Sequence, residues 1–360
     1  MLDEPLLIRA DGSPEIGTGH VMRCLALAQA WRAEGGPVYF VGEITGGLAS
    51  RLREEGITVR ALQSTPGGKK DALESARMAQ AVGATWVVVD GYHFDGLYQR
   101  WLREEGLRVL FLDDYGHADH YEADLVLNQN IDADTALYDD RMEETDLLLG
   151  PPYALLRKEF WPWRKSRRTP QPEANRVLVT LGGADPDNCT EMVVGALGRL
   201  NREDLRCTGV IGGSNPNESS IAAAAERTDA SVDLRSDVSD MASLMAEHDV
   251  AVSAGGSTCW ELAFMAIPNV IIVLADNQRG IAEGLEKAGA SRNLGWYEGV
   301  SQADVASALD SILRDKEKHL KMAESAMDLV DGEGTERVLQ KMRSRSVRVE
   351  SSTKKTSESR

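Results

Sequence analysis

The chain has 360 residues, of which 42% are hydrophobic and 27% are charged, a composition typical of globular proteins and a length that suits two domains. Its formal net charge of −17 disfavours binding to nucleic acid or to an anionic membrane surface. No stretch approaches the ~18 apolar residues of a membrane helix, and the first residues do not resemble a secretion signal. We therefore expect a cytoplasmic monomer that neither binds nucleic acid nor inserts into a membrane.

In the first half, short apolar segments of high β propensity alternate with amphipathic segments of helical period. This alternation is typical of βαβ units and predicts a parallel sheet. Helices are expected over Asp71–Val82 and over Val21–Glu34, which Gly35 and Pro37 bring to an end. The predicted strands are Leu6–Arg9, Val38–Val41, Ile57–Leu62, Trp86–Asp90, Val109–Asp113 and Leu125–Leu127.

The second half repeats the scheme. The sequence therefore predicts an α/β protein with two Rossmann-like, doubly wound domains that face each other across a cleft. The predicted strands are Arg176–Leu181, Leu205–Ile211, Ser231–Leu234, Val250–Ser253 and Val270–Val273. The predicted helices are Cys189–Leu200, Met241–Glu247, Thr258–Ala266 and Arg279–Ala288.

Proline, tryptophan and basic residues accumulate in Gly150–Glu173, which is the composition of a linker. We place an N-terminal domain with this linker at 1–172 and a C-terminal domain at 173–343. The last residues, 344–360, are polar and are expected to form a disordered tail. Because open α/β sheets bind ligands at the carboxyl ends of their strands, the loops after the strands are the expected site.

The loop from Arg9 to His20, between the first strand and the first helix, holds a candidate catalytic residue. Gly17 and Gly19 let the backbone approach a ligand, and the helix after them offers unpaired N–H groups. His20 lies at the start of that helix, where the dipole favours the neutral ring that a general base requires. From the local sequence alone, it is an equally good interpretation that His20 only caps the turn.

Two further loops of this half, Asp90–Asp95 and Asp113–His117, carry carboxylates and histidines at strand ends, and Asn128–Asn130 continues the polar rim. Such side chains bind sugar hydroxyls, and a carboxylate beside a histidine tunes its basicity. Ordinary turn chemistry is the alternative for each residue taken singly. We take Asp95 as a second candidate catalytic residue, and Arg9, Asp11 and Tyr92 as candidate substrate contacts.

In the second half, loops with paired glycines follow three strands, at Leu181–Asn188, Ile211–Asn217 and Ala254–Glu261. In the third of these loops, N–H and hydroxyl groups would face a diphosphate at the start of a helix, and a glutamate follows one turn later. A simple helix cap would explain the serine and the glutamate but not the double glycine. The candidate nucleotide-binding residues are Gly182, Gly183, Gly255, Gly256, Ser257, Thr258 and Glu261.

After the strand Val270–Val273 the chain reads Ala275-Asp276-Asn277-Gln278. The side-chain amides of Asn277 and Gln278 are suited to sugar hydroxyls, so we take both as substrate contacts. The alternative is that Asp276 or Asn277 caps the next helix.

Three motifs together resemble a known family: RADGSPEIGTGHVMRCLALA (Arg9–Ala28), LGGADPDN (Leu181–Asn188) and AGGSTCWELAFMAIPNVII (Ala254–Ile272). The chain resembles the UDP-2,4-diacetamido-2,4,6-trideoxy-β-L-altropyranose hydrolases of bacterial pseudaminic acid synthesis. That family is related in fold to the GT-B glycosyltransferases, among them the N-acetylglucosaminyltransferase that makes lipid II. The resemblance spans Leu6 to Gly334.

The resemblance implies a role for each matching residue. His20 would be the general base on the water that attacks the anomeric carbon, and UDP would leave by C–O cleavage with inversion. The sugar and diphosphate would approach Gly17 and Gly19, the sugar would contact Asn277 and Gln278, and the ribose would bind Glu261. The diphosphate would lie against Gly255–Thr258, and neither a metal nor another cofactor would be required.

Other functions stay open at this point. A GT-B glycosyltransferase would share the donor site and pass the sugar to an acceptor, and a related hydrolase or epimerase would act on another UDP-sugar. A non-catalytic nucleotide-sugar sensor is disfavoured by the presence of His20, Asp11 and Asp95. The aromatic and basic stretch Phe160–Arg168 would suit a membrane acceptor, but we prefer interdomain packing as its role.

Overall fold

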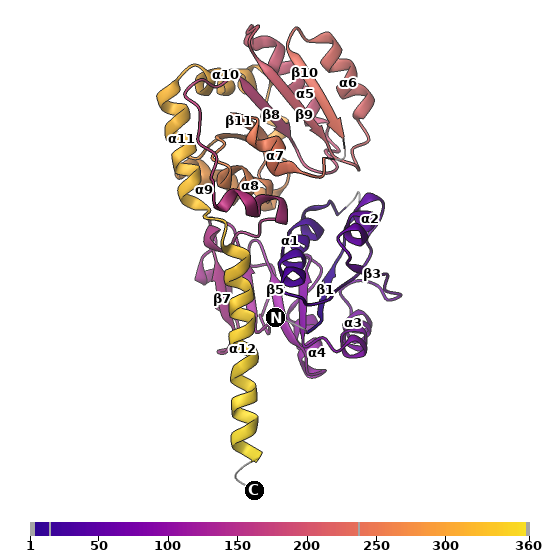
Figure 1. Cartoon of the computed structure of the whole chain (residues 1–360). Coiled ribbons are helices and arrows are strands. Elements are labelled where there is room, and N and C mark those ends of the chain that lie inside the picture. The colour runs from indigo at the N-terminus through magenta and orange to yellow at the C-terminus, as the bar shows by residue number, and fades with distance from the viewer. Residues whose placement is uncertain (1–3, 14–15, 237, 358–360) are drawn as a thin grey trace.

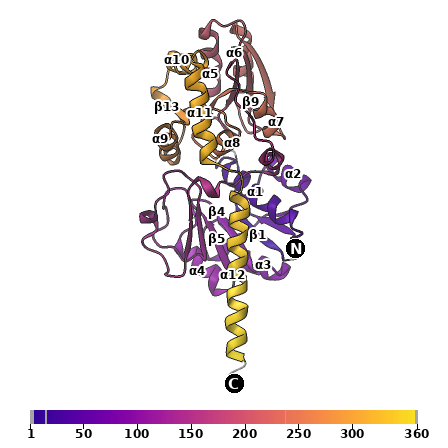
Figure 2. The ribbon, with the colours of Figure 1, turned by 60° about the vertical axis from the view of Figure 1, so that its left-hand side comes forward.

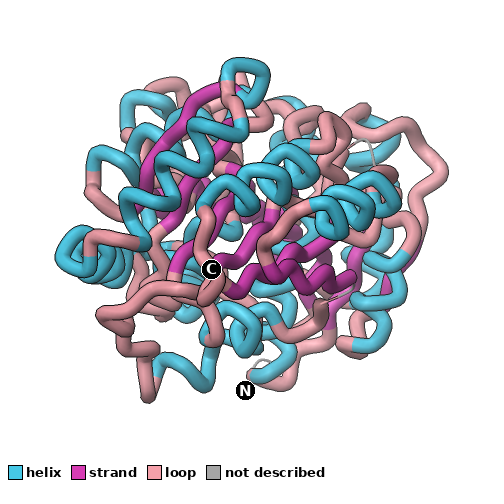
Figure 3. Tube along the Cα trace, turned by 90° about the horizontal axis from the view of Figure 1, so that it is seen from above, coloured by secondary structure: helices cyan, strands magenta, loops and turns pink. Residues whose placement is uncertain are grey.

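The computed structural model describes residues 4–13, 16–236 and 238–357. They form two α/β domains, one above the other in Figure 1, each built on a parallel sheet. Helices lie along both sides of the strands (Figure 3). The two doubly wound domains predicted from the sequence are therefore present. None of the described helices has both the length and the apolar character needed to cross a membrane.

Within the described residues, the first sheet has seven strands in the order β3-β2-β1-β4-β5-β6-β7. They are β1 (Leu6–Ala10), β2 (Val38–Val41), β3 (Thr58–Arg60), β4 (Trp86–Asp90), β5 (Arg108–Leu112), β6 (Leu125–Asn128) and β7 (Asp146–Leu149). The helices are α1 (Gly19–Ala33), α2 (Gly47–Glu54), α3 (Lys69–Val82) and α4 (Gly96–Glu104). The sheet grows in one direction from β1 and in the other from β4, so the ends of these two strands form the switch point where ligands bind.

The second sheet has the order β10-β9-β8-β11-β12-β13. Its strands are β8 (Arg176–Thr180), β9 (Arg206–Ile211), β10 (Ser231–Ser236), β11 (Val250–Ala254), β12 (Asn269–Val273) and β13 (Ser291–Trp296). Its helices are α5 (Cys189–Leu197), α6 (Glu218–Arg227), α7 (Met241–Ala246), α8 (Thr258–Phe264), α9 (Arg279–Lys287), α10 (Gln302–Leu313) and α11 (Lys316–Leu329). The edge strands β7 and β13 were not predicted.

The central strands read as unbroken apolar runs because both faces of each sheet are covered. In β4, Trp86 and Val88 pack into the core on one face, and Val87 and Val89 pack into the core on the other. Alternate residues of a strand point to opposite faces, so a strand covered on both sides needs an apolar residue at every position. The last residue of β4, Asp90, is a buried polar exception to this apolar pattern.

The linker packs between the domains rather than spanning them loosely. Leu155 belongs to the core of the first domain, whereas Leu156 and Phe160 belong to the core of the second. Trp161 packs against the first core and Trp163 against the second, which confirms the preferred interpretation of this aromatic stretch as interdomain packing. The linker thus belongs structurally to both domains.

The last helix, α12 (Gly334–Ser357), runs from the second domain back along the first and extends beyond it (Figures 1 and 2). Val338, Leu339 and Met342 are buried in the core of the first domain. The predicted second domain, 173–343, thus ends in residues that complete the first one. Of the predicted tail, 344–360, the part as far as Ser357 continues α12, and 358–360 lie outside the described residues.

Candidate active site

His20 is the second residue of α1, at the edge of the first sheet that faces the second domain. Its Nδ1 lies 2.6 Å from Oδ1 of Asp90, the last residue of β4. Because a carboxylate only accepts hydrogen bonds, Nδ1 carries the proton, and in the neutral ring Nε2 keeps its lone pair. The ring of Tyr92 covers His20 edge-on at 4.8 Å, and the His20 side chain is 9% exposed. His20 therefore does not cap the turn, and in this tautomer Nε2 is the ring nitrogen that can accept a proton.

Arg23, one turn further along α1, holds Asp90 from the other side. Its Nε lies 2.7 Å from Asp90 Oδ2 and its Nη2 lies 2.7 Å from Oδ1. Burial alone raises the pKa of Asp90, but the charges and hydrogen bonds of Arg23 and His20 outweigh it and hold that pKa well below its usual range. Asp90 is therefore a fixed carboxylate that orients His20.

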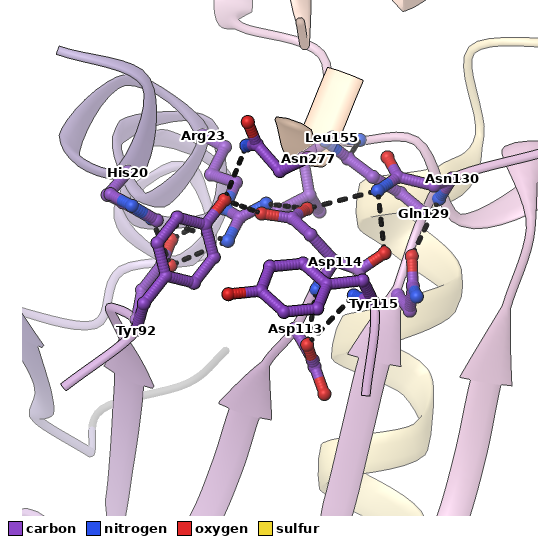
Figure 4. Close-up of polar contacts among 12 residues, drawn as sticks. His20, Arg23, Tyr92, Asp113, Asp114, Tyr115, Gln129, Asn130, Leu155 and Asn277 are labelled. Atoms are coloured by element: carbon purple, nitrogen blue, oxygen red, sulfur yellow. Dashed lines mark hydrogen bonds and ion pairs between the residues drawn. The ribbon is translucent and has the colours of Figure 1, made fainter. Parts of the chain in front are cut away.

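A chain of polar contacts continues from Arg23 into the second domain (Figure 4). Arg23 Nη1 lies 2.6 Å from Asp114 Oδ1, and the hydroxyl of Tyr92 donates to Asp114 Oδ2 at 2.5 Å. The Nδ2 of Asn277 donates to the Tyr92 oxygen at 2.6 Å. Burial and then the nearby charge of Asp114 raise the pKa of Tyr92 far above its usual value, so this hydroxyl stays protonated. The predicted residues His20, Tyr92 and Asn277 are thus brought together.

Asp95 does not join this group. It is the N-cap of α4, where its side chain accepts a hydrogen bond from the N–H of Tyr98 at 2.8 Å. Asp90, five positions earlier, holds the place beside His20. The turn interpretation applies to Asp95, and the structure does not support the prediction that it is catalytic.

Arg9 and Asp11 lie beneath the site, and each is only 1% exposed. Arg9 donates to Asp11 at 2.6 Å and to Asp71 at 2.9 Å, and the N–H of Glu43 donates to Asp11 at 2.6 Å. Burial raises the pKa of Asp11, but His93 and Arg9 outweigh it and lower the pKa to about 2. These residues brace the loop after β1 and are too buried to contact a substrate as predicted.

The glycines of the two facing loops differ in what surrounds them. A β-carbon on Gly17, whose φ is +84°, or on Gly19 would meet nothing within 4 Å, so the backbone is open there as expected. Gly182 is equally open, with φ +98°, whereas a β-carbon on Gly183 would lie 2.7 Å from the side chain of Thr18. Gly183 is thus a point where the second domain touches the loop that leads to His20.

The loop after β11 is held from behind by Gln278. The Oε1 of Gln278 accepts hydrogen bonds from the N–H of Gly255 at 3.2 Å and of Leu274 at 3.0 Å. Gly256 is open, and Ser257 and Thr258 begin α8 without a side-chain cap. Gln278 therefore shapes the loop through its carbonyl oxygen, and the space beside Gly256 is open.

Glu261, one turn into α8, is paired with the linker. The Nε and Nη2 of Arg157 each lie 2.8 Å from Glu261 Oε1. Arg157 and Arg23 were not predicted to have a role, and Asp90 and Asp114 were predicted only as members of their loops. The spacing of His20 and Arg23, three apart on a helix, was a usable signal. The Arg157–Glu261 contact joins residues 104 positions apart and had no local signal.

The comparisons with known proteins agree with this architecture. Residues 176–340 match the model of the glycosyltransferase family 28 C-terminal domain. The crystal structure of Acinetobacter baumannii MurG has a TM-score of 0.64 at 18% identity, with coverage of 94% of this chain and 98% of that one. A Staphylococcus aureus MnaA–UDP co-structure has a TM-score of 0.63 at 15% identity, with coverage of 93% and 95%. The fold is therefore GT-B-like.

Similar sequences include an uncharacterized protein of Methanocaldococcus jannaschii, 26% identical over 281 residues, which are 76% of this chain and 56% of that protein. The chain likewise covers 57% of the Bacillus subtilis spore coat polysaccharide biosynthesis protein SpsG, so it spans just over half the length of these relatives.

Two other relatives match over nearly their whole length. A UDP-N-acetylglucosamine--N-acetylmuramyl-(pentapeptide) pyrophosphoryl-undecaprenol N-acetylglucosamine transferase of Acidithiobacillus ferrooxidans is 28% identical over 92% of this chain and 94% of its own. The UDP-2,4-diacetamido-2,4,6-trideoxy-beta-L-altropyranose hydrolase of Campylobacter jejuni is 24% identical over 79% of this chain and 97% of its own.

Proposed function

We propose that the protein cleaves the anomeric C–O bond of a UDP-sugar, with His20 as the general base on an attacking water. The observation that carries this proposal is the hydrogen bond of 2.6 Å between His20 Nδ1 and Asp90, which leaves Nε2 free to accept a proton. A base held by a buried carboxylate in this way is the arrangement that general-base catalysis requires.

In the proposed reaction, Nε2 of His20 takes a proton from water while the water oxygen bonds to the anomeric carbon. The bond between that carbon and the phosphate oxygen breaks, and its electron pair leaves with UDP. Attack from the face opposite the leaving group inverts the anomeric centre. Asp90 stabilises the imidazolium as it forms, and Arg23 keeps Asp90 ionised and in place.

The nucleotide would lie on the second domain. We assign the diphosphate to the open loop of Gly256, Ser257 and Thr258, the ribose to Glu261, and the sugar to Asn277. The match of 176–340 to a glycosyltransferase C-terminal domain supports this division. The presence of UDP in the similar Staphylococcus aureus structure supports UDP as the nucleotide. Gly182 and Gly183 would face the nucleotide from the loop after β8.

Transfer to an acceptor hydroxyl is the second candidate, because the matching family model and the relative that covers 92% of the chain are both glycosyltransferases. The chemistry at His20 would be the same, with the acceptor oxygen in place of water. We favour water because the His20 side chain is 9% exposed and lies under Tyr92, which suits a small nucleophile.

The substrate that we propose is UDP-2,4-diacetamido-2,4,6-trideoxy-β-L-altropyranose, the sugar nucleotide in the name of the Campylobacter jejuni relative. The test is incubation with this compound in oxygen-18 water without an acceptor, followed by early mass spectrometry. The expected products are unlabelled UDP and a sugar that carries oxygen-18. Label in UDP would contradict attack at carbon. Tight UDP binding without release of UDP from this substrate would contradict hydrolysis of it and favour transfer, another sugar or a sensor.

A further inference from the structure

The contacts of the linker point to a role for Arg157 in nucleotide recognition. We propose that Arg157 is a positioning residue that fixes the carboxylate of Glu261 to accept the 2′- and 3′-hydroxyls of a ribose. The inference rests on the proposed function, in which Glu261 is the ribose ligand.

The geometry of the pair leaves one carboxylate oxygen unused. Arg157 Nε and Nη2 both point at Glu261 Oε1, each at 2.8 Å, and the two side chains are only 7% and 11% exposed. Among the described residues, none donates a hydrogen bond to Glu261 Oε2. A carboxylate oxygen has two lone pairs, so Oε2 can accept both hydroxyls of a diol.

Arg157 is required because a carboxylate as buried as Glu261 is costly unless it is paired. Its planar guanidinium approaches one carboxylate oxygen with two N–H groups, which restricts the rotation of the carboxylate. A carboxylate that is already oriented loses less conformational entropy when the ribose binds to it. Arg157 therefore acts through Glu261.

The third nitrogen of the Arg157 guanidinium, Nη1, contacts a second carboxylate. Nη1 lies 2.8 Å from Oε1 of Glu159, which in turn lies 3.6 Å from Nη2 of Arg51 on α2 of the first domain. The same Arg51 nitrogen donates to the carbonyl of Ser239 in the second domain at 3.2 Å. With both ends of its guanidinium engaged by carboxylates, Arg157 has a supporting role and is not a free phosphate-binding cation.

The experiment compares the binding of UDP and of 2′,3′-dideoxy-UDP by calorimetry. Wild type should prefer UDP by about tenfold or more, because hydrogen bonds to a charged group are strong. Arg157→Gln should lose that preference while its affinity for the dideoxy nucleotide stays within about twofold of wild type. The matched control is Arg168→Gln, because Arg168 is another buried linker arginine, 3.0 Å from Asp249 and away from Glu261. This control should keep the preference.

Several outcomes would overturn the inference. An Arg157→Gln protein that prefers UDP as wild type does would show that Glu261 needs no such partner. Equal weakening of both nucleotides would assign Arg157 to the fold or to phosphate. Should Arg157→Gln not fold, Arg157→Lys replaces it: lysine keeps the charge without the fork, and an undiminished preference would again overturn the inference.

A wild-type protein without any preference would have a different meaning, because it would remove the ribose contact of the proposed function itself. A Glu261→Gln background separates the ribose contact of Glu261 from the positioning role of Arg157. In that background Arg157→Lys should cause no further loss of preference, because Arg157 acts only through Glu261.

Discussion

Asn277 of the second domain donates a hydrogen bond of 2.6 Å to the hydroxyl of Tyr92, in the loop after β4 of the first domain. That hydroxyl donates to Asp114, and Asp114 accepts from Arg23. Arg23 in turn holds Asp90 beside His20. Contact between the domains and the orientation of the proposed base therefore depend on one connected set of side chains.

Tyr92→Phe should lower kcat/KM about tenfold, because it removes the acceptor of Asn277 and a donor to Asp114. Steady-state kinetics measures this. The control is Tyr115→Phe, since the neighbouring ring of Tyr115 lies 5.4 Å away and its hydroxyl has no hydrogen-bond partner among the described residues. Equal losses in both variants would mean that the interdomain hydrogen bond is unimportant.

His20→Ala should reduce turnover by about 10²–10⁴-fold while UDP affinity stays unchanged, because only the general base is lost. Asp90→Asn should also be severely impaired, since an asparagine amide no longer fixes the Nδ1–H tautomer of His20. Single-turnover kinetics and calorimetry together test both variants. Near-normal turnover of His20→Ala would remove His20 from the mechanism.

Asp95→Ala should lower the free energy of unfolding by about 1 kcal/mol, because it removes the N-cap of α4. Its turnover should change far less than that of Asp90→Asn. Urea unfolding and an activity assay on the same preparation separate the two roles. A loss of turnover as large as that of Asp90→Asn, without a loss of stability, would restore the original prediction that Asp95 is catalytic.

Gly183→Ala should weaken substrate binding, because a β-carbon there would lie 2.7 Å from the side chain of Thr18 and push the facing loops apart. Thr18→Ala removes the two clashing atoms, so the double variant should recover most of the lost kcat/KM. Kinetics of both single variants and the double variant measure the rescue. Failure of the rescue would mean that the effect of Gly183 does not arise at this contact.

Stability should depend on pH through Asp11. The folded-state pKa of Asp11 is lowered to about 2, below its ordinary value, so the unfolded chain takes up the proton first. The stabilisation of about 2 kcal/mol is present above pH ~4 and is lost as the pH falls toward ~2. In urea unfolding between about pH 5 and pH 3, Asp11→Asn should lose less stability than wild type, and identical slopes would refute this role.

The sheets were predictable because buried parallel strands contain unbroken apolar runs, as Leu6–Ile8 of β1 and Trp86–Val89 of β4 do. The position of His20 at a helix start was predictable because a glycine-rich loop precedes it. The edge strand β13 escaped prediction for the opposite reason: it reads SRNLGW and is mostly half-buried, so its sequence has no continuous apolar run.

The partners of the site residues were not predictable, because they depend on which strands are neighbours. Asp90 and Asp95 are both acidic residues after the same strand, and only the pairing of β1 with β4 shows that Asp90 is the one beside α1. Arg9 and Asp11 have side chains suited to sugars, but their burial could not be predicted, because it depends on distant residues such as Asp71 of α3, which pairs with Arg9.

The path of α12 has a consequence for how the protein is made. The core of the first domain receives Val338, Leu339 and Met342 from the far end of the sequence. On the ribosome, this domain emerges first but has an uncovered apolar surface until the second domain has been synthesised. The two halves therefore cannot mature as independent folding units, and a cut within the linker would leave the first half without part of its own core.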